Sequence, residues 1–452
     1  MIPKGSPCSG CPAYGLSPSY VPDEVKPGSP IYLLNQNPGA DEEAIGIPMV
    51  GKTGQAWENN FLGHAHLTRE DVSIGNAIRC RWGRSNDLPP VSTTMVKDAI
   101  AHCQRAYFHP PEGTKLFIAA GDYASYALTG TTIADGDKAG SGWRGYLRPY
   151  DPLGKQLKTQ PNLSKTLWMP QDSLRLPVLS TWHIARTFHQ PWWTLPTMMD
   201  WAKIPRILNG SWPKKPPTFA PKAPNPWPSM FTFDTEYDRE TKILKRYSMC
   251  WGLEDDQTCV IEAADHTMPA WWTGSQVVVQ YAPADLQHLA RLTGTRWQDD
   301  LWTKFLIEDI PWKHAVLWSD HQHDLNYLGS IYGSFNRWKH LGESNPTLYA
   351  GLDATGLFEI NRALEAELDR DPISRKVWET IDRPALRVFV SAQYRGIRVN
   401  SDRVTEATGL LEREREEATL KAQAVVGWPI NLGSNPQTER QLYKIEGVKE
   451  PR

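Results

Sequence analysis

Residues 231–237 of the chain read Phe-Thr-Phe-Asp-Thr-Glu-Tyr. The bulky residues that alternate before Asp234 predict the end of a half-buried β-strand. Side chains two apart in a strand point the same way, so Asp234 and Glu236 are expected to share one face. Paired carboxylates supply the oxygen ligands that hard cations such as Mg²⁺ prefer. The pattern is short, and it indicates a metal site only if further carboxylates follow it.

Further carboxylates follow in the next 120 residues. Residues 247–251 and 257–261 are expected to continue the sheet, and Gln276-Val-Val-Val-Gln280 predicts another buried strand. Asp285 is expected to open a helix that carries Leu286, Leu289 and Leu292 on one face. Tyr349 and Asp353 are four residues apart, a spacing that places both on one side of a helix. The further carboxylates that a metal site at Asp234 and Glu236 needs are therefore present in the sequence.

This set resembles the 3′–5′ exonuclease domain of family A DNA polymerases, with its Asp-x-Glu and Tyr-x-x-x-Asp motifs. The resemblance implies a ribonuclease H-like fold and Mg²⁺ or Mn²⁺ as the metal. It also implies that Asp234, Glu236, Asp285 and Asp353 hold the metal, and that Tyr349 orients the attacking water. Tyr281 stands where that family has an Asn that places the substrate strand. Asp324, in His323-Asp-Leu-Asn-Tyr-Leu328, is interpreted as structural.

Toward the N-terminus, a proline-rich stretch indicates a domain boundary. Residues 213–228 contain seven prolines in 16 positions, together with Lys214, Lys215 and Lys222. Proline lacks the backbone donor that helices and central strands need. A semi-rigid polyproline spacer is expected here, and its lysines either touch a phosphate backbone or are simply solvated.

Four cysteines in the first half of the chain form a candidate metal centre. Cys8 and Cys11 are a CxxC pair at the N-terminus, and Cys80 and Cys103 follow. Four thiolates without a partnering histidine pattern suit zinc or an iron–sulfur cluster. Scattered structural cysteines are the alternative.

A turn follows the short apolar strand Ile31-Tyr-Leu-Leu34. It reads Asn35-Gln-Asn-Pro-Gly39, at the end of the strand where ligands bind in open α/β sheets. Gly46-Ile-Pro-Met-Val-Gly51-Lys52-Thr53 matches the phosphate-loop pattern letter for letter. We reject that interpretation, because a phosphate loop leaves a buried strand directly, whereas Asp41-Glu-Glu-Ala precedes Gly46 and a proline lies inside the loop.

Together these features resemble the family 4 uracil-DNA glycosylases over about 190 residues. That family has a CxxC pair, a Gly-Glu-Ala-Pro-Gly strand end, a glycine-rich loop, an Asn-x-x-x-Cys segment, a fourth cysteine and a late Thr-x-His-Pro. The counterparts here are Cys8 and Cys11, residues 35–39 and 46–54, Asn76 to Cys80, Cys103, and Thr181-Trp-His183. The resemblance implies a three-layer α/β/α domain whose four cysteines hold a [4Fe-4S] cluster. Residues 115–121, followed by Ala124, Ala127 and Gly130, resemble the strand–helix step of the family.

The resemblance also implies roles for single residues. A base that is to be cleaved from its sugar is flipped into a pocket and recognised along its Watson–Crick edge. An amide can donate to one edge group and accept from another, which suits Asn76. His183 is placed to stabilise the charge that develops on uracil, and Asn37 to position water. Three residues depart from the pattern: Gln36 replaces the acidic Glu, Met49 replaces the stacking Phe, and Ile184 replaces the Pro.

Just after His183 come Arg186, Phe188 and Trp192. These three side chains either flank or insert into DNA, or they simply cover the sheet.

The C-terminal stretch predicts a long helix over residues 401–426 that Ser401 caps, with Val404, Ala407 and Leu411 at helical spacing. Its glutamates are expected to form a solvated face. Residues 431–442 resemble the thumb entry of family A polymerases, and no stretch resembles the fingers or palm. We therefore expect either the front piece of a longer protein, of a phage type, or a separate polymerase chain.

Composition limits the remaining classes of function. The chain has 452 residues, 40% hydrophobic and 22% charged, with a net charge of −2, so DNA contacts are expected from local basic patches. There is no apolar run of membrane-spanning length and no signal-like start, so we expect a cytoplasmic protein of a bacterial or phage-infected cell.

The sequence thus predicts an α/β protein in four parts: a glycosylase-like domain (1–208), a linker (209–228), an exonuclease domain (229–375) and a helical thumb-like fragment (376–452). We expect it to act on DNA, namely on single strands, 3′ ends and uracil-containing strands, as a base-excising or uracil-sensing protein that also proofreads. The alternative is a non-catalytic DNA-binding subunit that docks a separate polymerase. Intact carboxylates favour an enzyme, whereas Gln36, Met49 and Ile184 favour a binding role for the first domain.

Overall fold

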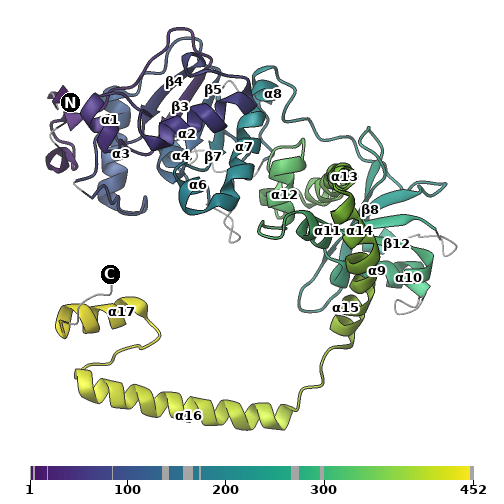
Figure 1. Cartoon of the computed structure of the whole chain (residues 1–452). Helices are drawn as coiled ribbons and strands as arrows, with labels where there is room; N and C mark the ends of the chain where they lie inside the picture. Colours follow the sequence, from purple (N-terminus) through teal and green to yellow (C-terminus); the bar gives the residue numbers. More distant parts are fainter. Residues whose placement is uncertain are drawn as a thin grey trace. The chain divides into compact units, whose positions relative to one another are not determined.

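The computed structural model describes residues 2–3, 6–17, 19–83, 85–134, 142–155, 166–172, 175–265, 274–295 and 300–447. Contacts divide the chain into two compact units, Met1–Ser391 and Ala392–Arg452. The first unit contains two five-stranded sheets and the second unit is helical (Figure 1).

The first sheet has the strand order β4-β3-β5-β7-β6 and is parallel except for its edge strand β6. Its strands are β3 (Ile31–Asn35), β4 (Val72–Asn76), β5 (Leu116–Ala120), β6 (Leu147–Pro149) and β7 (Pro177–Thr181). The associated helices are α1 (Ala40–Ile45), α2 (Lys52–Asn60), α3 (Thr94–Tyr107), α4 (Asp122–Thr129), α6 (Arg186–His189), α7 (Thr194–Ala202) and α8 (Ile204–Leu208). A two-stranded ribbon of β1 (Ile2–Pro3) and β2 (Ser19–Tyr20) precedes them.

Both faces of this sheet are buried, which explains why β3 is a continuous apolar run rather than an alternating one. Ile31 and Leu33 pack with Trp57 of α2 and Trp201 of α7. The other face carries Tyr32 and Leu34, which pack with α3 and α4. The predicted three-layer α/β/α arrangement is confirmed (Figure 1).

The second sheet has the order β10-β9-β8-β11-β12, with β8 antiparallel to β9 and parallel to β11. Its strands are β8 (Met230–Tyr237), β9 (Leu244–Cys250), β10 (Thr258–Glu262), β11 (Gln276–Val279) and β12 (Leu306–Asp309). The helices of this part are α9 (Ala282–Thr293), α10 (Asp300–Lys304), α11 (Ile310–Leu317), α12 (Leu325–Tyr332), α13 (Pro346–Arg370), α14 (Pro372–Val377) and α15 (Arg383–Arg395).

The pleat of β8 separates its side chains between two layers. Phe231 and Phe233 pack with α9 and α15 on one face. Thr232 points to the other face, where its hydroxyl donates to the Ala354 carbonyl of α13 at 2.8 Å. Since side chains alternate along a strand, Asp234 and Glu236 follow Thr232 toward α13. The helix α9 begins at Ala282, three residues before the predicted opening at Asp285.

The proline-rich stretch has no helix or strand, as its composition predicts, but it is not a free spacer. Ala220 forms a β-bridge with Cys259, and the side chain of Phe219 lies against Gly351 of α13. Trp227 packs on the core beneath β8. The stretch is therefore bound along the second sheet.

A buried polar network joins the two sheets of the first unit through α12 and the loop that follows it. The Tyr146 hydroxyl donates to the Asn326 carbonyl at 2.7 Å, and Asn336 bonds both backbone groups of Leu147, at 2.9 and 3.0 Å. The guanidinium of Arg144 pairs with Asp200 at 2.7 Å and also bonds Ser330. Unpaired polar groups would be costly in such a place, so the network specifies a defined junction.

The second unit contains α16 (Ser401–Val426) and α17 (Asn435–Glu439). The range of α16 agrees with the prediction, and none of its residues is buried. Its N-cap is Asn400 rather than the predicted Ser401, because the Asn400 side chain accepts from the Arg403 N–H at 3.1 Å. No helix in the described part of the chain is long and apolar enough to cross a membrane.

Candidate functional site

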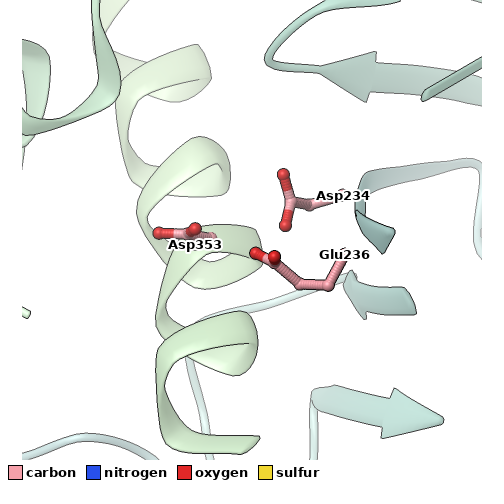
Figure 2. Close-up of side chains that lie close together, drawn as sticks. All are labelled: Asp234, Glu236 and Asp353. Atoms are coloured by element: carbon pink, nitrogen blue, oxygen red, sulfur yellow. The ribbon is translucent and has the colours of Figure 1, made fainter. Parts of the chain in front are cut away.

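Three carboxylates come together between β8 and α13. Asp234 and Glu236 of β8 and Asp353 of α13 each offer an oxygen, and these oxygens lie within 4.8 Å of one another. Figure 2 shows the two strand residues reaching toward the helix that carries Asp353. Within the described residues this is the only such group of three potential metal ligands.

The electrostatics of this cluster are those of crowded, buried acids. Burial raises the pKa of Asp234 well above its ordinary value, and the charges of Asp353 and Asp285 raise it further. Burial and Asp353 likewise raise the pKa of Glu236. The Oδ2 atom of Asp234 is buried and has no hydrogen-bond partner. A divalent cation would satisfy that oxygen and relieve the repulsion, so the donor set fits Mg²⁺ or Mn²⁺.

Asp285 lies near the other three acids, but its carboxylate is held by different partners, one of which, Thr235, points to the opposite face of β8. Its carboxylate accepts from the Thr235 hydroxyl at 2.6 Å and from the Tyr281 N–H at 3.1 Å. Burial raises its pKa to about 7, although these two hydrogen bonds lower it. The structure therefore places Asp285 near the other three acids without including it in the close group.

Two residues that sequence reasoning missed hold Asp353. The Lys339 ammonium lies 2.7 and 2.8 Å from its two oxygens, and the Trp338 indole N–H donates to Oδ1. Lys339 is also 3.2 Å from the hydroxyl of Tyr349, which lies one turn before Asp353 on α13. Burial alone would lower the pKa of Lys339, but the charge of Asp353 raises it above its ordinary value. No motif in residues 333–345 indicates this contact.

A second candidate site is a cavity of about 570 Å³ at the carboxyl edge of the first sheet. Ligands bind at this edge in open α/β folds. Every residue that the sequence proposes for base binding and excision lines it, namely Gln36, Asn37, Met49, Asn76 and His183. Asn86, Lys52 and His189 also line it and were not predicted.

Two asparagines that line this cavity are the last residues of neighbouring strands. Asn35 and Asn76 are register partners at the ends of β3 and β4, and both are buried. The Asn35 Nδ2 atom has no hydrogen-bond partner. Asn37 donates to the side-chain oxygen of Asn86 at 2.6 Å, which fixes its amide at the rim.

The glycine-rich loop over the cavity is held by two charged side chains. The Glu42 carboxylate accepts from the Gly39 and Met49 N–H groups at 2.7 Å each. Arg69 donates to the carbonyls of Pro48 and Met49 at 2.6 and 2.9 Å. The carbonyl of Met49 approaches Gly54 so closely that a Cβ there would lie 1.8 Å from it. The Met49 side chain is thereby fixed between the core and the cavity.

His183 follows β7 and lies against Gly121, where a Cβ would come within 3.2 Å of the histidine Cβ. Its Nδ1 accepts from the Ala185 N–H at 3.3 Å, so in the neutral ring the proton is on Nε2. Burial lowers the pKa of His183 to about 4. The ring is therefore a neutral hydrogen-bond donor at physiological pH.

This shift predicts a pH dependence of stability. Between pH 6.5 and 4 the unfolded histidine binds a proton and the folded one does not, so its contribution to stability falls as pH falls. We expect His183→Gln to lose less stability between pH 7 and pH 5 than the wild type in urea unfolding. His64→Gln, at an exposed histidine, serves as the control. If the free energy of unfolding changed with pH equally in His183→Gln and the wild type, the lowered pKa of His183 would be contradicted.

The four cysteines of the first half line one small cavity. Cys8, Cys11, Cys80 and Cys103 face it together with Tyr107 and Arg79, and none is in a disulfide. Four thiolates facing one cavity form a donor set that suits a zinc ion or an iron–sulfur cluster.

The three residues predicted just after His183 lie at the surface of the first half. Phe188 and Trp192 are exposed, by 51% and 47%. The Arg186 guanidinium stacks on Trp182 at 3.9 Å instead of extending into solvent.

Comparison with known proteins bears on the first half of the chain. Residues 22–191 match the family model described as the uracil DNA glycosylase superfamily. Type-4 uracil-DNA glycosylases align with it: that of Archaeoglobus fulgidus is 32% identical over 83 residues (18% of this chain, 41% of the relative), and that of Pyrobaculum aerophilum is 29% identical over 96 residues (21% and 45%). The chain thus spans less than half the length of these curated relatives. The resemblance predicted for this part of the sequence is confirmed.

Solved structures give more distant similarities. The POL domain of Pol1 from M. smegmatis, in complex with DNA primer-template and dNTP, has a TM-score of 0.39 at 17% identity, with 50% of this chain and 39% of that chain covered. Brucella melitensis NrnC with bound Mg²⁺ has a TM-score of 0.31 at 17% identity, with 40% and 92% covered.

Proposed function

We propose that the chain is a DNA-processing hydrolase with two separate reaction centres. The first is a metal-dependent 3′–5′ exonuclease site at Asp234, Glu236, Asp353 and the adjacent Asp285. The observation that carries this proposal is the buried, unpartnered oxygen of Asp234 inside a cluster of acids that repel one another. Most carboxylates lie at the surface and show neither property, and a buried carboxylate oxygen without a partner is costly.

In this mechanism the chain's own residues place the terminal phosphodiester of a single strand. Divalent ions bound there would neutralise the phosphate and lower the pKa of a bound water. Tyr349, on the same helix as Asp353, orients the attacking water through its hydroxyl. Asp234 and Glu236 come from the strand and Asp353 from the helix (Figure 2), so a terminal phosphate bound there would lie between the two elements.

The experiment is a 5′-labelled single strand incubated with the full chain in Mg²⁺ or in EDTA. We expect a ladder of shortened strands in Mg²⁺ alone. An intact strand in both samples would overturn the exonuclease proposal and favour the alternative of a non-catalytic DNA-binding subunit.

We propose as the second centre a uracil-DNA glycosylase site in the 570 Å³ cavity. The observation that favours it is the convergence of the buried Asn76 and the neutral His183 on one cavity within the matched residues 22–191. Asn76 would read the edge of a flipped base through its amide. The Nε2–H of His183 would donate to the oxygen on which charge develops. Asn37, fixed by Asn86, would position the water.

The cysteine centre is proposed to hold a [4Fe-4S] cluster through Cys8, Cys11, Cys80 and Cys103. Such a cluster would tie the N-terminal segment to α3, which carries Cys103. Its chemistry is not required in either proposed reaction, so we assign it a structural role.

We expect the protein purified without oxygen to contain about four iron and four sulfide per chain, as the cluster type requires. Cys103→Ser should lose most of this iron together with the visible absorption. Cys250→Ser is the control, since Cys250 is also buried but donates to the Gly252 carbonyl in the other half. One zinc and no sulfide in the wild type would refute the cluster.

The second unit is proposed to be a thumb-like piece that associates with polymerase palm and fingers, either in the same longer protein or in a separate chain. The helix α16, of which no residue is buried, is consistent with such a role.

A further inference from the structure

Asp353 carries its charge in a nearly dry environment. Its side chain is 3% exposed, whereas that of Lys339 is 21% exposed. A buried carboxylate without a partner is strongly unfavourable, and here the partner is Lys339, from the short helix Lys339–Leu341 that precedes α13. The ammonium bonds both oxygens, at 2.7 and 2.8 Å. Both Asp353 oxygens therefore already face a cation.

A divalent ion at the same place would have to share these oxygens. Mg²⁺ binds carboxylate oxygens at about 2.0–2.1 Å and requires near-ideal geometry. An ammonium ion that already bonds both oxygens occupies part of that shell. Two cations a few ångströms apart also repel each other strongly when partly buried. The ion and the Lys339 ammonium therefore compete for Asp353.

We propose that Lys339 is a resident cation of the carboxylate site, which holds Asp353 while no metal is bound and is displaced from it when a divalent ion binds. The inference rests on the proposed exonuclease site and adds a residue that controls its metal affinity. Metal binding is then an exchange of one cation for another at Asp353.

The surroundings of Lys339 suit such an exchange. Lysine has a flexible stem and a point charge, whereas arginine would form a rigid two-pronged pair with the carboxylate. The Tyr349 hydroxyl lies 3.2 Å from Nζ, so the ammonium keeps a partner when it leaves Asp353. The Trp338 N–H continues to hold Asp353 Oδ1, which maintains the geometry of the acid during the exchange.

The test is calorimetric titration of the metal-free full chain with MnCl₂, for the wild type and for Lys339→Met. Methionine fills similar space without charge. We expect Mn²⁺ to bind Lys339→Met tighter by roughly tenfold or more, because a repelling unit charge is removed at close range. The metal-free variant should have a lower melting temperature than the wild type. Addition of Mn²⁺ should raise the melting temperature of the variant by more than that of the wild type.

Two further variants make the result decisive. Lys245→Met removes a lysine that is 60% exposed and 3.7 Å from Asp238, and it should leave the affinity unchanged. Lys339→Arg keeps the charge and should bind Mn²⁺ no more tightly than the wild type. Equal or weaker binding by Lys339→Met, or tighter binding by Lys339→Arg, would overturn the exchange while leaving the exonuclease proposal intact. The absence of Mn²⁺ binding in both the wild type and Lys339→Met would instead overturn the exonuclease site itself.

Discussion

Replacing Asp234 by Asn should reduce Mg²⁺-dependent shortening of a single strand by roughly a thousandfold, since metal-held charge stabilisation is worth several kcal/mol and each 1.36 kcal/mol is a factor of ten. Asparagine occupies the same volume but removes the charge of the most buried acid of the strand. The measurement is the rate of loss of the terminal nucleotide under single-turnover conditions.

The same variant should be more stable than the wild type without metal. Burial raises the pKa of Asp234, so its ionisation in the folded protein opposes folding as pH rises. The neutral amide of Asp234→Asn would remove that opposition, and the melting temperature of the metal-free variant should exceed that of the wild type at pH 8. Asp238→Asn is the control, because Asp238 is a half-buried acid in the hairpin just beyond β8 and is not one of the clustered carboxylates. Two results would contradict the assignment. One is an equal loss of exonuclease activity in Asp234→Asn and Asp238→Asn, and the other is a lower melting temperature of Asp234→Asn than of the wild type.

Replacing His183 by Ala should lower the rate of uracil excision by about 10²–10³-fold, the usual cost of removing one hydrogen-bond donor from a developing anion. The loss should fall on kcat, since the donor acts mainly in the transition state. The measurement is alkali-dependent strand breakage at one uracil, in EDTA so that the exonuclease is silent.

The pH profile separates this role from a structural one. Since the pKa of His183 is about 4, the wild-type rate should show no step near pH 6.5 that reports a histidinium. His64→Ala, at an exposed position, should retain the wild-type rate. A step near pH 6.5 that disappears in His183→Ala would show that the charged ring acts instead.

Local patterns in the sequence predicted much of the fold because they report local physics. The apolar run at Ile31 and the valines at 277–279 form strands where expected, and residues 401–426 form the long helix. The error at Ser401 is of one residue: Asn400 and Ser401 are both good caps, and only the backbone geometry decides between them. The observed start of α9, at Ala282, precedes the predicted start at Asp285 for a similar reason, since Pro283 suits the first turn of a helix.

Contacts between distant segments could not be predicted in this way. The linker prolines correctly excluded helix and strand, but nothing in their pattern indicates that Phe219 packs on Gly351. The pair of Lys339 with Asp353 depends on the path of the loop before α13, and lysine is too common on surfaces to serve as a signal. The junction of Arg144 with Ser330 joins residues 186 apart.

The central claim is that one chain carries a metal-dependent exonuclease and a metal-independent glycosylase. Its most direct test is one 5′-labelled single strand with one internal uracil, incubated with wild type or Asp234→Asn in Mg²⁺ or EDTA, with and without alkali. We predict a ladder only for the wild type in Mg²⁺, and an alkali-dependent break at the uracil for both proteins in EDTA. An intact strand under every condition would contradict the claim.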